Sequence, residues 1–198
     1  APMALLAAGM AGLALLPFLL PYWRVYADQG LSRSLVDVEM YSASIADYLT
    51  TPGRLHAWLW SSRFSGTALF PGVVGFGLAV VAVATGVALR DGRARMCLAM
   101  GVVGVALSFG IKLPGYAALW EALPLLHAIR APVRFGYLGV VAVAMLAGFG
   151  AVAIRRRVAP QAWPPLVALL MTMAAIETMA APIGLSRFEG VPAIYATL

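Results

Sequence analysis

The chain has 198 residues, of which 62% are hydrophobic and 11% are charged. A soluble domain usually carries about 25% charged residues, so this sequence is not suited to face water over most of its surface. The net charge of +6 is concentrated between long uncharged blocks, which is typical of a membrane protein. No basic stripe with interleaved aromatic residues lies outside those blocks, which argues against nucleic-acid binding. The single cysteine, Cys97, excludes a disulfide framework and a cysteine-based metal site.

Five apolar blocks approach or reach the length of about 20 residues that a helix needs to cross a bilayer. In chain order they cover 3–20, 69–89, 96–111, 136–154 and 163–182. The third block is short, and we expect Arg95 and Lys112 to extend outward from its ends. The sequence therefore predicts an all-α fold, a polytopic transmembrane helix bundle with about five spans over 1–182. The region 183–198 is expected to begin an extracytoplasmic part.

Small residues within these blocks predict close packing of the spans. In lipid, apolar side chains gain nothing by hiding from one another, so helices associate where small residues let their backbones approach. The glycines concerned are Gly101, Gly104, Gly139, Gly148 and Gly150.

The short loops set the expected orientation of the spans. The basic clusters 90–95 and 155–157 lie directly at the ends of apolar blocks, so both are expected to be cytoplasmic. The loop 21–68 carries four arginines and four acids, which cancel, and it is expected to face outward. The segment 112–135 and the tail after Pro182 are expected on the same outward side, with the N-terminus inside. Three cations break this trend and require a functional explanation: Lys112, Arg130 and Arg134.

The first outward loop predicts an amphipathic helix. Apolar residues recur with helical spacing at Leu31, Leu35, Val38, Tyr41, Ile45 and Tyr48 or Leu49. Ser34 and Asp37 form a plausible capping box at its start, and the sequence at 50–53 stops it. Such a helix would lie on the outer membrane surface or roof the bundle.

The polar residues of this helix leave two interpretations open. Asp37, Glu39 and Asp47 form either a solvated face or a set of ligand contacts, and Ser44 lies on the same face. Trp58, Trp60 and Phe64 follow as an expected interfacial belt.

The outward segment 114–135 is apolar but interrupted. Pro124 and Pro132 break it, while 116–123 has room for two turns of helix. Non-helical backbone at membrane depth is tolerated where it packs on protein or lines a cavity. We expect a short re-entrant or interfacial helix beside the entry of the fourth span.

Arg130 and Arg134 are the strongest candidates for a binding site. They are four residues apart at the mouth of the fourth span, within reach of one anionic group. The planar guanidinium group donates two parallel hydrogen bonds to a phosphate and keeps its charge when it is desolvated. The alternative is that both contact lipid headgroups and pair with Glu121. His127 and Lys112 complete the candidate substrate- or lipid-phosphate-binding set, although a lone histidine in such a loop is also explained as structural.

Glu177 is the acid that lies inside an apolar block. An ionised carboxylate there is costly, so it is expected to be neutral, paired or in contact with a wet cavity. The expected partners are Arg130, Arg134 or Lys112, in a structural ion pair, with proton relay as the weaker alternative. His56 has no companion ligand at metal spacing, and no metal or cofactor site is visible in the sequence.

The pattern P-x-x-x-x-x-R-x-P-x-R-F begins at Pro124 and ends at Phe135. Three other short stretches accompany it, namely 41–44 with 47–49 after the first span, 69–72 at the start of the second, and 191–198. Together and in order, these stretches resemble bacterial polytopic membrane proteins of the YfhO-like or GT-C-type glycosyltransferase family. The resemblance extends over nearly the whole chain.

The resemblance implies transfer of a sugar from a polyprenyl-phosphate donor on the outer face of the bacterial cytoplasmic membrane. In that family the catalytic acid lies in the first outward loop of the full protein, so no catalytic residue is carried over to this chain. The chain opens at Ala1-Pro2 without an initiator Met, which predicts a fragment whose missing N-terminal spans are partners, together with the lipid bilayer and the donor. The competing interpretation is a non-catalytic scaffold or transporter-like protein that binds anionic lipid or polymer.

Overall fold

The structure is a computed structural model that describes residues 9–10, 12–17, 20–21, 24, 28, 34–123, 126–127 and 129–182. Every regular element among these residues is a helix, which confirms the all-α class within the described part of the chain. The chain divides into two compact units, and each has its own buried core. Unit 1 comprises 1–43 with 104–136, and unit 2 comprises 44–103 with 137–198.

Unit 1 is built from short helices around an aromatic core. Its elements are α2 (Leu35–Met40), the 3-10 helix η2 (Gly110–Lys112), α8 (Tyr116–Ala122) and the 3-10 helix η4 (Pro132–Phe135). Val38, Tyr116, Trp120 and Leu126 are buried together at its centre. The presence of α8 confirms that the interrupted segment 114–135 contains a short helix.

The amphipathic helix expected after the first span is two helices instead of one. The capping box of Ser34 and Asp37 begins α2 as predicted, but the chain leaves helical geometry after Met40. A second helix, α3 (Ile45–Leu49), then begins with its own capping box, formed by Ser44 and Asp47.

Long-range hydrogen bonds explain this break within unit 1. The backbone N–H of Ala43 donates to the carbonyl oxygen of Ser108 at 2.8 Å, and that of Val133 donates to the carbonyl oxygen of Tyr41 at 3.1 Å. Backbone groups that a continuous helix would pair internally are therefore used by distant segments.

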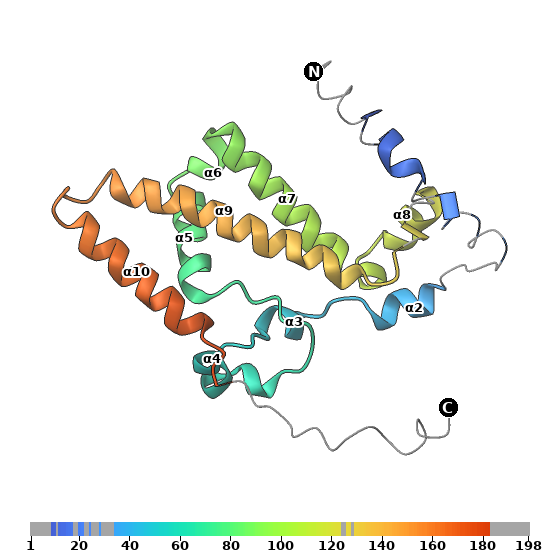
Figure 1. Cartoon of the computed structure of the whole chain (residues 1–198), viewed down its shortest axis with the longest axis horizontal. Coiled ribbons are helices and arrows are strands. Elements are labelled where there is room, and N and C mark those ends of the chain that lie inside the picture. Colours follow the sequence, from blue (N-terminus) through green and yellow to red (C-terminus); the bar gives the residue numbers. More distant parts are fainter. Residues whose placement is uncertain are drawn as a thin grey trace. The chain divides into compact units, whose positions relative to one another are not determined.

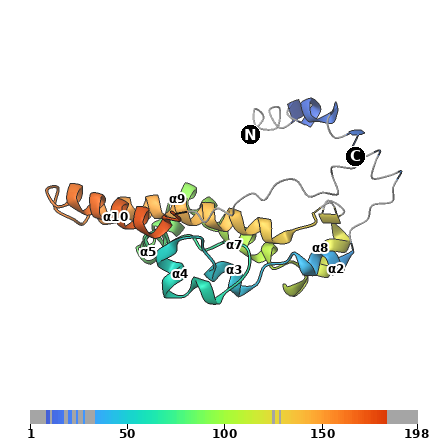
Figure 2. The ribbon, with the colours of Figure 1, turned by 60° about the horizontal axis from the view of Figure 1, so that its bottom comes forward.

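Unit 2 holds the longer helices. They are α4 (Arg54–Leu59), η1 (Ser61–Arg63), α5 (Val73–Ala84), α6 (Val87–Arg90), most of α7 (Gly92–Ser108), nearly all of α9 (Gly136–Arg155), and α10 (Trp163–Thr178), with α3 at its start. Figures 1 and 2 show the C-terminal end of α10 beside α4, and α10 also contacts α5. The core is made mostly of small residues, with Ala79, Ala82, Ala88, Ala94, Cys97 and Leu146 buried together.

Two of the glycines named above bring helices of unit 2 into close contact. A Cβ at Gly101 of α7 would lie 2.7 Å from the Cβ of Ala142 on α9. A Cβ at Gly150 of α9 would collide with the carbonyl oxygen of Leu78 on α5. These positions confirm close helix packing, whereas Gly148 faces open space.

The predicted apolar blocks match helices of the structure to different extents. The fourth matches α9, and η4 with α9 makes Pro132–Arg155, the one helical segment in the described part that is long and apolar enough to cross a membrane. The second is interrupted at Gly86, whose φ of +74° ends α5 and starts α6. The third appears as α7, and the fifth as α10, a shorter apolar helix that ends at Thr178. The region 183–198 and much of 3–20 lie outside the described residues, so the five-span arrangement stays a prediction.

Candidate functional site

Lys112 is held by the turn that follows α2. Its ammonium group donates to the carbonyl oxygens of Ser42 and Ala43, both at 3.2 Å. The turn comes close because Gly110, with φ of +48°, has no Cβ to collide with the Ser42 hydroxyl group. Two of the three ammonium donors are thereby committed to backbone, which leaves one for an external anion.

Arg130 is oriented by an aromatic ring. Its Nη2 donates to the hydroxyl oxygen of Tyr41 at 2.7 Å, and its Cζ lies 4.7 Å from the centroid of that ring. The bond from Val133 N–H to the Tyr41 carbonyl oxygen keeps this tyrosine in place. The arginine side chain is nevertheless exposed, so its remaining N–H groups are accessible to an external partner.

Arg134 is the freest of these cations. It lies on η4, which begins with Pro132 at the first position of the helix, and its side chain is exposed. Among the described residues its guanidinium group has neither a hydrogen-bond nor an ion-pair partner. Glu121, the alternative partner, is exposed and forms no ion pair within the described part of unit 1. No described acid of this unit is bonded to either arginine.

His127 and Tyr116 pack into the core of unit 1. The His127 Nε2 lies 2.9 Å from the carbonyl oxygen of Trp120, and the two rings are tilted by 31° with centroids 4.6 Å apart. Since a carbonyl oxygen only accepts, Nε2 donates this hydrogen bond and is not free for an external anion. Tyr116 is 1% exposed, and burial raises the pKa of its hydroxyl group.

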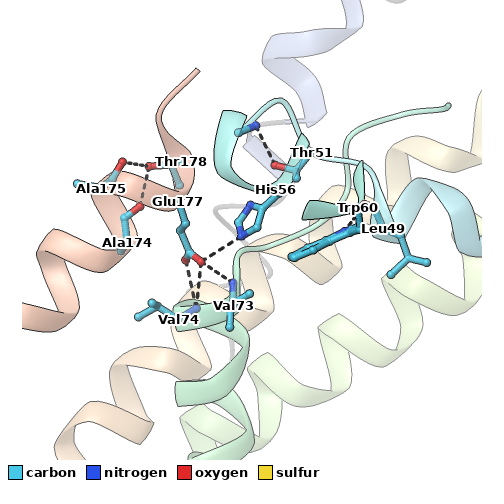
Figure 3. A network of polar contacts seen from close by, with 11 residues as sticks. Leu49, Thr51, His56, Trp60, Val73, Val74, Ala174, Ala175, Glu177 and Thr178 are labelled. Carbon is cyan, nitrogen blue, oxygen red and sulfur yellow. Dashed lines mark hydrogen bonds and ion pairs between the residues drawn. The ribbon is translucent and has the colours of Figure 1, made fainter. Parts of the chain in front are cut away.

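Glu177 forms a buried pair, but with His56 instead of a cation from 112–134. Its Oε2 lies 3.6 Å from His56 Nε2, and both side chains are buried (Figure 3). The same carboxylate accepts from the backbone N–H of Val73 at 2.8 Å and of Val74 at 3.2 Å. These are the first N–H groups of α5, which have no partner inside the helix. Glu177 therefore caps α5 from α10 and meets the positive end of its dipole.

Gly72 allows this cap to close. It precedes α5 with φ of +89°, and a Cβ there would lie 2.6 Å from Oε1 of Glu177. On the other side, His56 lies among aromatic rings, with its ring centroid 4.7 Å from Trp60 and 5.2 Å from Phe70. Figure 3 shows the His56 ring beside the carboxylate, and its Nδ1 has no hydrogen-bond partner among the described residues.

Asp47 is also a helix cap. The polar residues of 34–49 were expected to form either a solvated face or ligand contacts, and Asp47 instead bonds within the protein. Its carboxylate accepts from the backbone N–H and hydroxyl group of Ser44, both at 2.7 Å, and from the N–H of Thr67 at 2.6 Å. Burial alone would raise the pKa of Asp47, but these hydrogen bonds lower it below its usual value. Asp37 has the matching role in α2, whereas Glu39 is exposed. The two aspartates thus serve the fold.

The sequence contains a local signal for the capping role of Asp47 but none for the pairing of His56 with Glu177. Ser44 and Asp47 repeat the spacing of Ser34 and Asp37 ten residues earlier, so the second capping box was readable. His56 and Glu177 come from distant helices, and nothing in their local sequence links them. Trp58 is 82% exposed, in accord with the expected aromatic belt, while Trp60 packs on His56.

Comparisons with protein-family models, curated proteins and solved structures give no match to this chain. Among the described residues, no group of three or more His, Cys, Asp or Glu side chains is placed to hold a metal ion.

Proposed function

We propose that this chain is part of a polytopic bacterial inner-membrane protein of the GT-C type. Its outward face would bind the phosphate of a polyprenyl-phosphate-linked sugar. The observation that carries the proposal is the pair of exposed guanidinium groups at the start of α9. Arg130 is fixed on Tyr41, and Arg134 has no partner among the described residues. Two cations in that state bind a phosphate without first breaking an internal ion pair.

The membrane location is supported by the exposure of α9. Only 33% of the most apolar part of Pro132–Arg155 is buried, although a core helix of a soluble protein would be mostly covered. Val141, Met145 and Val152 are each close to half exposed along this helix. Exposed apolar side chains over such a length are stable in lipid and costly in water.

In the proposed reaction the bond between the sugar anomeric carbon and the phosphate oxygen breaks. The anomeric carbon bonds to an acceptor hydroxyl oxygen, whose proton passes to a base elsewhere in the protein. The departing polyprenyl phosphate carries the negative charge. Arg130 and Arg134 would stabilise that charge as it develops, which lowers the barrier electrostatically.

A non-catalytic scaffold that binds anionic lipid is the second candidate. It is favoured by the use of Asp37, Asp47 and Glu177 as helix caps, because none of them is available as a general base. The two candidates share the phosphate site and differ in whether sugar is transferred.

The test is binding of a polyprenyl phosphate to the protein in neutral nanodiscs, followed by an assay with the corresponding sugar donor. We expect Arg130→Ala and Arg134→Ala each to weaken binding by about tenfold. Arg63→Ala is the matched control, because Arg63 is exposed on η1 and has no partner among the described residues. Unchanged affinity in both arginine variants would overturn the site, whereas binding without transfer would support the scaffold.

A further inference from the structure

A second cationic site lies in unit 2, in a groove beside the break between α5 and α6. The groove has a volume of about 480 Å³, within the usual range for ligand sites. Thr85, Val87, Arg90 and Asp91 line one side, and Phe149, Val152, Ala153 and Arg156 of the α9 end line the other. These arginines belong to the two basic clusters that flank the apolar blocks.

The groove exists because the chain turns at Gly86. This residue adopts the left-handed conformation, with φ of +74°, so α6 leaves the direction of α5. The guanidinium group of Arg90 then lies across the break, where a Cβ at Gly86 would be 3.6 Å from its Cζ and Nε. The Thr85 hydroxyl group already donates to the carbonyl oxygen of Val81 at 2.7 Å. Recognition of a ligand would therefore fall to the arginines.

The charges of the groove are not neutralised inside the protein. Among the described residues neither Arg90 nor Arg156 has a side-chain hydrogen bond or ion pair. Asp91 is the acid in the lining, and its Oδ1 is held at the start of α7 by the N–H groups of Arg93 at 2.8 Å and Ala94 at 3.2 Å. Its charge faces the positive end of that helix dipole, so the two guanidinium groups dominate the groove.

The walls combine this charge with apolar surface. Val152 is 47% exposed and Phe149 is half-buried, and both lie on α9, the helix proposed to span the membrane. A soluble phosphate would use the arginines and leave the exposed apolar surface of the groove uncovered. A phospholipid would use both, with its phosphate on the arginines and its acyl chains along Phe149 and Val152.

We infer that this groove binds the headgroup of one anionic phospholipid. The inference rests on the proposed membrane location, but not on the polyprenyl-phosphate site of unit 1. It assigns Arg90 and Arg156 to headgroup recognition, beyond a general excess of positive charge in cytoplasmic loops.

The test measures binding of short-chain phosphatidylglycerol to the protein in neutral detergent, at physiological salt. We expect Arg90→Ala/Arg156→Ala to weaken binding by at least about tenfold. The matched control is Arg95→Ala/Arg157→Ala, which removes the same charge from the same clusters at two positions that do not line the groove. It should weaken binding by less than about threefold, because salt screens distant exposed charges. Arg90→Lys/Arg156→Lys keeps the charge but loses the planar fork, so an intermediate loss is expected.

Several outcomes would overturn the inference. Equal losses in the groove and control doubles would mean diffuse electrostatic attraction instead of a site. Competition by glycerol phosphate at the same concentrations would mean a site for soluble phosphate. Loss of polyprenyl-phosphate binding in Arg130→Ala/Arg134→Ala and loss of phosphatidylglycerol binding in Arg90→Ala/Arg156→Ala are separate measurements, so failure of the proposed donor site and failure of this groove are distinguishable.

Discussion

The buried acids of unit 2 differ from the exposed cations of unit 1 in how many of their partners lie inside the protein. In unit 2 the buried acids Asp47 and Glu177 have all their partners inside the protein, at the beginnings of helices. In unit 1 the cations Lys112 and Arg130 are only partly satisfied, and Arg134 has no partner among the described residues. A charge with complete internal partners maintains the structure, whereas an oriented charge with spare donors indicates a partner outside the chain.

The largest loss of stability is expected when the Glu177 carboxylate is removed. Glu177→Ala leaves the N–H groups of Val73 and Val74 and the ring of His56 without an acceptor. We expect a loss of about 2–4 kcal/mol in the free energy of unfolding, because two N–H groups at the start of α5 lose a charged acceptor, and denaturant titration in detergent measures it. Glu177→Gln keeps one acceptor oxygen and should cost clearly less. Stability close to wild type in the alanine variant would show that the pair is not structural.

Gly72→Ala tests the same cap from the opposite side. The substitution forces a side chain into a positive-φ position and places a Cβ 2.6 Å from Oε1 of Glu177. A loss of about 2–3 kcal/mol is expected in the same titration. Gly75→Ala is the control, since nothing lies within 4 Å of a Cβ built there in α5, and it should be neutral or slightly stabilising. Equal effects at both positions would contradict the proposed geometry.

The stability that Asp47 contributes is expected to depend on pH. Its lowered pKa means that the folded state favours the charged form, so the stability it contributes is present above the usual aspartate range. That contribution is lost as the pH falls through the native pKa. Asp47→Asn should cost about 1–2 kcal/mol at pH 7 and flatten the loss of stability below about pH 4. Unfolding curves measured from pH 7 to pH 3 test this. Parallel pH curves for variant and wild type would argue against it.

The smallest stability effects are expected at the cations of unit 1. Arg130→Ala removes one hydrogen bond and one ring contact to Tyr41, both exposed, and should cost only about 0.5–1 kcal/mol. Tyr41→Phe keeps the ring and should cost less, while Arg134→Ala should leave unfolding unchanged. Thermal unfolding of the three variants checks this order. A large loss of stability in Arg134→Ala would mean that Arg134 is structural. The contrast between the buried acids of unit 2 and the exposed cations of unit 1 would then no longer hold.

Local signals in the sequence predicted several parts of the structure. The apolar run at 136–154 matches α9, the Ser34 and Asp37 pair caps α2, and the interrupted segment contains α8. Each of these depends on residues close together in the chain.

Long-range contacts could not be predicted in the same way. Glu177 and Val73 are 104 positions apart. The break after Met40 depends on the hydrogen bond from Ala43 to the Ser108 carbonyl oxygen and on the one from Val133 to the Tyr41 carbonyl oxygen. No local pattern specifies such contacts, because tertiary hydrogen bonds override helical propensity. For the candidate site, the choice of Arg130, Arg134 and Lys112 stays a prediction, and the contact of Tyr41 with Arg130 could not be predicted because the two residues are 89 positions apart.

Phosphate binding by Arg130 and Arg134 is tested most directly by photo-crosslinking with a polyprenyl phosphate that carries a diazirine next to the phosphate, followed by peptide mapping. We expect labelling of the peptide that contains Arg130 and Arg134, and loss of that labelling in Arg130→Ala/Arg134→Ala. The free energy of unfolding of this double variant should stay close to the wild-type value, lowered only by the small loss of the contact between Arg130 and Tyr41. Labelling that persists in the double variant, or that maps only to other segments, would contradict the assignment of these arginines to phosphate binding.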